Sequence, residues 1–164
     1  MGESYVECMV SRKASGLLGA LKFLLGAVAL ICFLIGTVFW VSMILAVVAG
    51  AGAYFANMYA KLEYEYLYVD REITVDKILN RSRRKKVEKL EVDRMEIFAP
   101  IRSWHLDSMK NRQFKTVDYS SGIAGQPDRR YVMIYNGERK VIFEPSEAFV
   151  KALQSVAPRK VFLD

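Results

Sequence analysis

The most chemically distinctive feature of this sequence is a short segment that is dense in cations. Between Asn80 and Leu90 it holds six Lys or Arg residues and one acidic residue, Glu88. Such cations attract phosphate groups, and each one near an anionic lipid surface gains about 1 kcal/mol. This basic segment (residues 81–89) therefore predicts contact with lipid headgroups, and a solvated turn that only sets membrane orientation is the alternative. Its cations are Arg81, Arg83, Arg84, Lys85, Lys86 and Lys89.

The basic segment accounts for the net charge of the C-terminal part of the chain. Residues 61–164 contain 21 Lys or Arg and 16 Asp or Glu, and outside the basic segment the two signs are equal in number. Nucleic acid is not an expected partner, because no basic surface with interleaved aromatic residues extends beyond this segment. Membrane lipids, a membrane protein or a second copy of the chain are the partners that we expect.

No other residues form a pattern typical of catalysis. His105 is the only histidine, and Asp107 follows it two positions later, but no nucleophile can be placed beside them. One histidine with Cys8 and Cys32 cannot build a closed metal site. The sequence also lacks a glycine-rich phosphate loop and a nucleophile elbow. We therefore expect a non-enzymatic protein without cofactor or metal, and a small membrane enzyme with an unrecognised site is the remaining alternative.

A long apolar stretch precedes the basic segment and predicts a membrane anchor. Residues 23–60 carry no charge, and as one straight helix they would measure about 57 Å, against a hydrocarbon core of roughly 30 Å. The stretch therefore predicts a transmembrane α-helical hairpin over residues 17–60, with spans at about 17–36 and 38–58. A cleaved signal peptide is less favoured, because this apolar stretch is much longer than that of a signal peptide.

The charges around the hairpin predict its orientation. Arg12 and Lys13 precede the first span, Lys61 follows the second, and the connecting loop is uncharged. The positive-inside rule then places both termini in the cytoplasm of a two-span, multi-pass protein of the cell membrane. The expected parts are an N-terminal cytoplasmic segment (1–16), the hairpin (17–60) and a cytoplasmic domain (61–164).

Small residues in the second span predict close helix packing. Ala46 and Gly50 stand four residues apart, as do Ala49 and Ala53, and this spacing lets two helix backbones approach in lipid. The favoured interpretation is that the hairpin packs on itself. The other interpretation is a self-association face, which would make the protein a structural subunit that oligomerises through its second helix.

Before the hairpin, the sequence predicts a short amphipathic helix. Ser4 and Glu7 have the spacing of a capping box. Tyr5, Val6, Met9 and Val10 then share one helical face. Such a segment would lie on the membrane surface or dock on the soluble domain, and a disordered segment is the alternative.

Residues 61–164 begin with alternating patterns that are typical of strands. Tyr64, Tyr66 and Tyr68 share one face of the first strand, and a packed face is favoured over a binding ladder. Proline cannot donate a backbone hydrogen bond to a neighbouring strand, so Ala99-Pro100 should end the third strand. The expected elements are strands over 62–69 and 72–79 with a tight turn at 70–71, a polar loop over 80–86, a third strand from about 87 towards 97, and a short strand over 114–119.

The last part of the chain predicts a β-hairpin followed by a helix. Asn136-Gly137 lies between the apolar-rich runs 130–135 and 138–143, and Asn-Gly is the preferred dipeptide of a type I′ turn. Pro145 and Ser146 suit the first turn of a helix. The expected fold is an antiparallel sheet or partly open barrel with a C-terminal helix, which makes the soluble part an α+β domain.

This order of elements resembles that of bacterial PH-like domains, which are often joined to short paired membrane helices. The stretches "EYEYLYVDREITVDK", "RMEIFAPI", "KTVDYSSG", "DRRYVM" and "APRKVF" are similar to a family of small bacterial two-helix membrane proteins for which no activity is established. The similarity runs from "ESYVEC" to Phe162. It implies a membrane-anchored binding module whose PH-like domain contacts anionic lipid headgroups or a protein partner, since PH-like domains often use basic loops between strands in this way.

Overall fold

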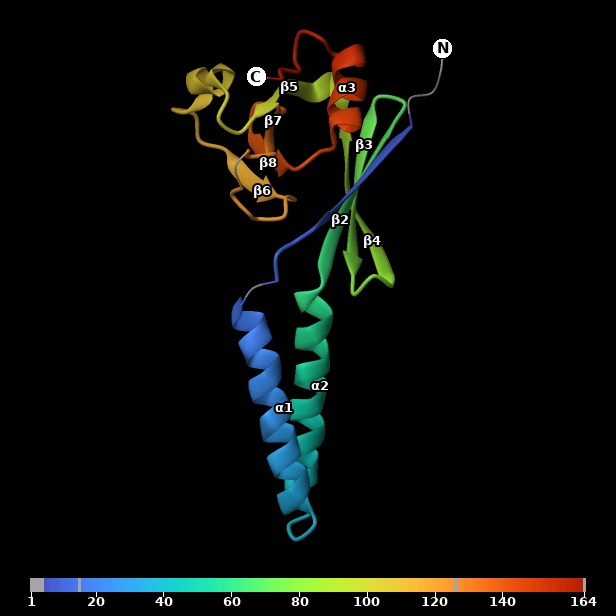
Figure 1. The fold of residues 1–164 in the computed structure, drawn as a ribbon, viewed down its shortest axis with the longest axis vertical. Coiled ribbons are helices and arrows are strands. Elements are labelled where there is room, and N and C mark those ends of the chain that lie inside the picture. Colours follow the sequence, from blue (N-terminus) through green and yellow to red (C-terminus); the bar gives the residue numbers. More distant parts are fainter. Residues whose placement is uncertain (1–4, 15, 126, 164) are drawn as a thin grey trace. The chain divides into compact units, whose positions relative to one another are not determined.

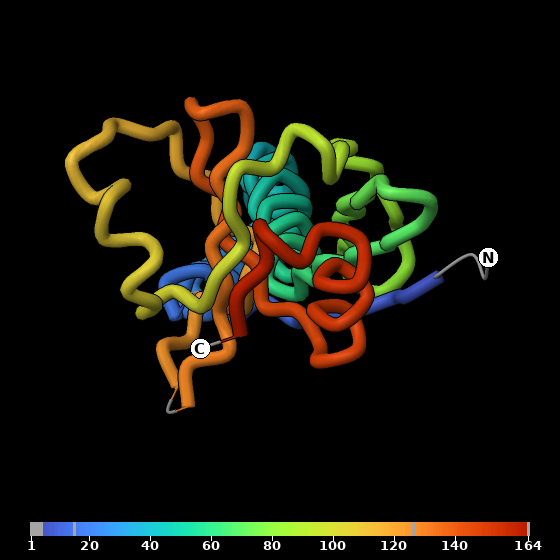
Figure 2. The backbone as a smooth tube through the Cα atoms, turned by 90° about the horizontal axis from the view of Figure 1, so that it is seen from above, coloured from blue at the N-terminus to red at the C-terminus, as the bar shows by residue number. Residues whose placement is uncertain are grey.

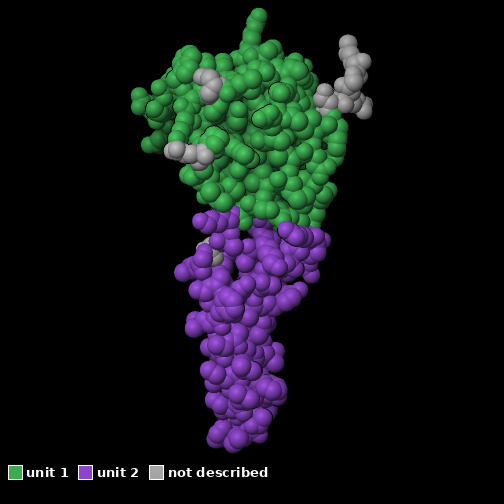
Figure 3. Space-filling model, viewed as in Figure 1, with its two compact units in different colours: residues 1–12, 63–78, 84–164 green, residues 13–62, 79–83 purple. Residues whose placement is uncertain are grey.

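The computed structural model describes residues 5–14, 16–125 and 127–163. The chain divides into two compact units, which Figure 3 shows in different colours. The first unit contains residues 1–12, 63–78 and 84–164, and the second contains residues 13–62 and 79–83.

The second unit is built on two apolar helices, α1 (Gly16–Gly36) and α2 (Val41–Ala60), joined by a short turn (Figure 1). Both helices are long and apolar enough to cross a membrane. At the turn a Cβ on Gly36 would lie 2.8 Å from the side chain of Met43. The glycine therefore allows the close approach of the two helices that the predicted hairpin requires.

The first sheet contains four strands in the order β1-β2-β3-β4. β1 (Val6–Ser11) pairs antiparallel with β2 (Leu62–Val69), and β3 (Glu72–Leu79) and β4 (Arg83–Glu91) follow. The predicted N-terminal helix over residues 4–10 is therefore wrong over residues 6–10, whereas Ser4 lies outside the described residues. Alternating residues of this segment face opposite sides of the sheet, and β2 supplies the hydrogen bonds that a short isolated helix would lack.

Three two-residue turns shape the strands. Both central residues have positive φ at 70–71, 80–81 and 136–137, as a type I′ turn requires. The predicted turns at 70–71 and 136–137 are thus confirmed. The predicted polar loop over 80–86 is wrong, because β4 begins at Arg83. Most of the basic segment therefore lies on an edge strand, where lysines and arginines are tolerated.

The second sheet has the order β5-β7-β8-β6. β6 runs parallel to β8, which corrects the expectation of purely antiparallel strands. The predicted third strand from 87 towards 97 is also divided, because a 3₁₀ turn at Val92–Arg94 separates β4 from β5 and lets the chain change sheets. The bounds are Met95–Pro100 for β5, Lys115–Asp118 for β6, Tyr131–Tyr135 for β7 and Arg139–Phe143 for β8.

The core of the first unit is aromatic. Tyr66 is fully buried and makes edge-to-face contacts with Phe143 and with Phe149 of α3 (Glu147–Val156). Ser146 caps α3 by accepting a hydrogen bond from the amide of Phe149 at 3.3 Å. The tyrosine row of β2 is thus a packed face. Two long apolar helices, then antiparallel and mixed sheets with a C-terminal helix, confirm the expected fold class.

Candidate functional site

The cations of the basic segment occupy the turn before β4 and β4 itself. Arg81 is a central residue of the type I′ turn, and the other five cations lie on β4. All six are exposed, and β4 forms one edge of its sheet. A two-residue turn and an edge strand thus present positive charge along one continuous stretch of backbone.

Two of these cations are engaged by carboxylates of the same sheet. Arg84 Nη2 lies 2.7 Å from Glu65 Oε1, and Glu65 is completely buried. Lys89 Nζ lies 2.7 Å from Glu72 Oε2 and lowers the pKa of that carboxyl group. Arg84 therefore stabilises the fold, because without it the buried carboxylate of Glu65 would have no cation beside it.

Other cations of the segment carry charge that the fold does not neutralise. Within the described residues, Arg83 and Lys85 form no ion pair, and both are exposed. Lys86 is exposed as well, and its field contributes to the lowered pKa of Glu72. These three residues are the part of the segment best able to meet an external anion.

Glu88, the only acidic residue of the segment, forms contacts within the domain. Glu88 Oε1 accepts a hydrogen bond from the Tyr119 hydroxyl at 2.7 Å, and Glu88 Oε2 lies 2.8 Å from Arg139. Burial, with the Glu88 carboxylate as the second cause, raises the pKa of Tyr119. Glu88 is therefore neutralised within the domain and subtracts little from the positive field outside it.

The turn before β4 lies at the end of α2, within the helical unit. The amide of Asn80 donates to the carbonyl of Lys61 at 2.8 Å, and Lys61 is the C-cap residue of α2. Arg81 follows Asn80 directly. The start of the basic segment is thus held beside the last turn of a helix that is long and apolar enough to span a membrane.

Arg81 adopts a backbone conformation that ordinarily favours glycine or asparagine. Its φ is +55°, in the left-handed region, where a residue with a Cβ is disfavoured by about 1–2 kcal/mol. The comparable turn at 136–137 places glycine at this position. Arg81 therefore carries a local conformational cost, as Arg71 does in the turn at 70–71.

Sequence reasoning missed the carboxyl groups beneath β4. The Asp70-Arg71 turn and the hydrogen bond between Asn80 and Lys61 place β2 and β3 in a register with Glu65 opposite Asp76. Glu65 Oε2 and Asp76 Oδ1 are buried and have no hydrogen-bond partner within the described residues. Burial, and then the neighbouring carboxyl group of Glu7, raise the pKa of Glu65. The Glu65–Asp76 pair follows from the turn at 70–71 that the sequence predicts, whereas only the pairing of β1 with β2 brings Glu7 to it.

The only histidine of the sequence lies in an aromatic stack, in keeping with the expectation that it has no catalytic role beside Asp107. His105 is stacked between the rings of Trp104 and Phe162, with ring centroids 3.8 and 3.7 Å apart. Asp107 pairs with Lys110 at 2.7 Å. Among the residues described, no group of three His, Cys, Asp or Glu side chains could hold a metal ion.

The small residues of α2 divide between two environments. Ala46 and Ala49 are buried in the helical unit, and Ala53 is half-buried. A Cβ on Gly52 would lie 3.3 Å from Leu25 of α1, whereas a Cβ on Gly50 would meet nothing within 4 Å. Part of the small-residue set therefore permits packing within the hairpin, and Gly50 is not required for it.

Comparison with known proteins decides the family. The family model described as "Bacterial PH-like domain (DUF6106)" matches residues 2–163. The chain belongs to this family. Among curated proteins and solved structures, none matches the chain. The PH-like domain of this family has no known function, and PH-like domains are typically non-catalytic binding modules.

Proposed function

We propose that this protein is a non-enzymatic, membrane-anchored binding module whose PH-like domain contacts anionic lipid headgroups through the basic segment. The hairpin of α1 and α2 is the anchor, and the domain that follows it lies in the cytoplasm. The observation that carries this proposal is the hydrogen bond between the amide of Asn80 and the carbonyl of Lys61. It joins the start of the basic segment to the end of α2.

The length of α2 relates that hydrogen bond to the membrane. α2 has 20 residues, and a helix of this length measures about 30 Å, the thickness of the hydrocarbon core. If α2 spans the bilayer, Lys61 lies at the level of the headgroups. The amide nitrogen of Asn80 lies 2.8 Å from the carbonyl oxygen of Lys61. Arg81, the next residue, then lies at the same level, where phosphate groups are concentrated.

Three exposed cations of β4 supply the expected attraction. Arg83, Lys85 and Lys86 are exposed, and each Lys or Arg near an anionic leaflet gains about 1 kcal/mol. This attraction falls off over about 10 Å at 0.1 M salt. The proposed contact is therefore strongest at low ionic strength and requires no enclosed pocket.

The test measures which lipids surround the full chain. We would reconstitute it in vesicles of phosphatidylcholine and phosphatidylglycerol, extract discs with a polymer, and measure the lipid ratio by mass spectrometry. Wild-type discs should be enriched in phosphatidylglycerol at low salt and should lose the enrichment at high salt. The triple variant Arg83→Glu, Lys85→Glu, Lys86→Glu should show little enrichment at either salt concentration.

The control variant changes the same charges elsewhere in the domain. Lys115, Lys151 and Arg159 are also exposed, and their replacement by glutamate should leave the enrichment intact. Arg84 is kept in both variants, because it pairs with the buried Glu65. A lipid ratio unaffected by the β4 substitutions would overturn the proposal and favour a protein partner.

A further inference from the structure

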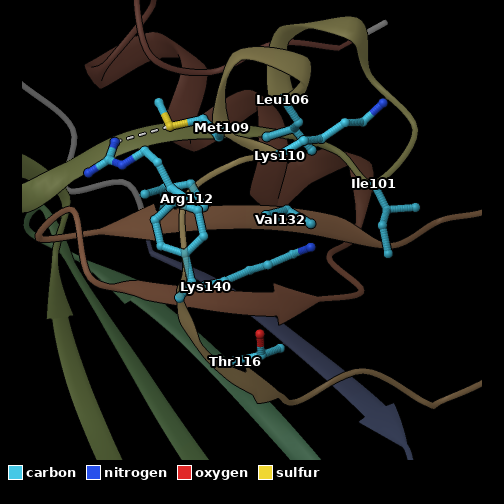
Figure 4. Close-up of a pocket in the computed structure, with 10 residues that line it drawn as sticks. Ile101, Leu106, Met109, Lys110, Arg112, Thr116, Val132 and Lys140 are labelled. Carbon is cyan, nitrogen blue, oxygen red and sulfur yellow. Dashed lines mark hydrogen bonds between the residues drawn. The ribbon is translucent and has the colours of Figure 1, made fainter.

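The second sheet bears a pocket that is separate from the basic segment. Its volume is about 350 Å³, and Figure 4 shows the side chains that line it. Val132 and Ile134 of β7 form its apolar floor. The remaining apolar walls come from the segment over residues 101–114, which Figure 2 shows looping outward from the sheet, and they are Ile101, Leu106, Met109 and Phe114.

The segment over residues 101–114 covers Val132 and Ile134, which are almost fully buried at the base of the pocket. Ile101, Leu106, Met109 and Phe114 pack against the cluster that contains Val132 and Ile134. Strand pairing places Ile97, Ile134, Lys140 and Thr116 in one row across all four strands. Directly paired residues share a face of a sheet, so this row changes from apolar to polar across the pocket floor.

Lys140 is the cation of the pocket that has no partner. Lys110 Nζ lies 2.7 Å from Asp107, and Arg112 is held by Glu96 at 3.3 Å and by the carbonyl of Gly137 at 2.9 Å. Lys140 is half-buried, and within the described part of the chain no hydrogen bond or ion pair engages its amino group. Figure 4 shows its side chain extending along the sheet beside Val132. An ammonium group beside apolar side chains is stabilised when an anion binds next to it.

We propose that this pocket binds a small amphiphile with one anionic group and an apolar chain. The chain lies against the half-buried side chains of Ile101, Leu106, Met109 and Phe114, and the anion is held by the Lys140 ammonium group with the Thr116 hydroxyl beside it. The pocket volume falls within the roughly 300–1,000 Å³ of ligand pockets. One available cation favours a single negative charge, so a long-chain carboxylate or a lipid-derived monoanion fits better than a polyphosphate.

Methionine-methyl NMR on the full chain in phosphatidylcholine nanodiscs tests this site, because Met109 lines the pocket. Titration with octanoate should shift the Met109 methyl signal saturably. Acetate lacks the chain, octanol lacks the charge and octylammonium has the opposite charge, so each should bind at least about tenfold more weakly. A tenfold change corresponds to about 1.4 kcal/mol. Octyl phosphate then distinguishes a phosphate-bearing ligand from a carboxylate.

Two lysine variants isolate the charge. Lys140→Met keeps most of the side-chain length, removes the ammonium group and should weaken octanoate binding at least about tenfold, within the range for a charge-assisted hydrogen bond. Lys110→Met removes a pocket lysine that is already paired and should leave the affinity within about twofold. Unchanged methyl signals of the other methionines would show that both variants are folded. Equal binding of octanol and octanoate, or no effect of Lys140→Met in the folded variant, would overturn the proposal.

Discussion

Burial without a full set of hydrogen bonds makes Glu65 an unfavourable position for a negative charge. One of its oxygens pairs with Arg84, the other has no hydrogen-bond partner within the described residues, and Asp76 stands opposite on β3. Burial and the nearby Glu7 carboxyl group raise the pKa of Glu65. The folded state therefore binds this proton more readily than the unfolded state. The resulting stabilisation is complete below the unfolded pKa and is lost as pH rises through the folded pKa.

Glu65→Gln should raise the melting temperature of the domain, and the gain should grow from pH 5 to pH 8. Glutamine keeps an oxygen that accepts from Arg84 and removes the buried charge. Thermal unfolding of the full chain, followed by circular dichroism, measures the difference. Glu63→Gln on the same strand is the control for the glutamate-to-glutamine change outside the Glu65–Arg84 pair. A gain from Glu65→Gln that is independent of pH would contradict this interpretation.

Arg81→Gly should weaken the proposed lipid contact. Glycine readily adopts the positive φ found at this position, so the turn should keep its backbone conformation. The phosphatidylglycerol enrichment should fall because one cation at the end of α2 is lost. Arg71→Gly is the matched control, since Arg71 also has positive φ, and it should leave the enrichment unchanged.

At the scale of elements, β4 and α2 each combine a structural requirement with a proposed role. The charged side chains of β4 oppose pairing of this exposed edge with another strand, and three of them, Arg83, Lys85 and Lys86, are the cations that we propose to contact lipid. In α2, Ala46 and Ala49 are buried whereas a Cβ on Gly50 would meet open space. The favoured interpretation, packing within the hairpin, therefore applies to part of the small-residue set, and Gly50 is left for the alternative of self-association.

Ala49→Leu should disturb the hairpin, and Gly50→Leu should not. Overpacking at a buried position costs about 1–3 kcal/mol, so Ala49→Leu should lower the thermal stability of the full chain in detergent. Gly50→Leu should leave that stability nearly unchanged. Chemical crosslinking of both variants provides the second measurement. Loss of crosslinked oligomers in Gly50→Leu alone would favour the assembly subunit over an anchor that acts as a monomer.

At the scale of the whole molecule, a hairpin anchor and a binding domain require one membrane orientation. Arg12 and Lys13 precede α1, Lys61 follows α2, and the turn between the helices has no charge. The lipid contact that we propose needs the anionic cytoplasmic leaflet. Both the N-terminal strand and residues 61–164 should therefore be on the cytoplasmic side.

Protease digestion from outside should leave residues 61–164 intact in right-side-out cells. The same protease should remove this domain in inverted membrane vesicles, which serve as the control for accessibility. Immunodetection of a C-terminal tag measures both outcomes. Removal of the domain from outside would reverse the orientation and would place the basic segment away from the anionic leaflet.

Local sequence patterns determined much of this protein. The apolar stretch over residues 23–60, the Asn136-Gly137 turn and the Ser146 helix cap were all predictable. The tyrosine row of β2 was predictable too, because two-residue periodicity marks one face of a strand. In each case the signal lies within one element, so neighbouring residues are sufficient to specify it.

Only the tertiary structure decided which separate elements meet. β1 pairs with a strand that follows the helical hairpin, β6 joins β8 in parallel, and β4 begins within the cations that local chemistry marked as a loop. The tertiary structure also decided the ion pair between Arg84 and Glu65, and the pairing of Lys140 with Ile134 on one side and Thr116 on the other. These relations depend on hydrogen bonding and burial between segments far apart in the chain, which no local pattern of residue types encodes.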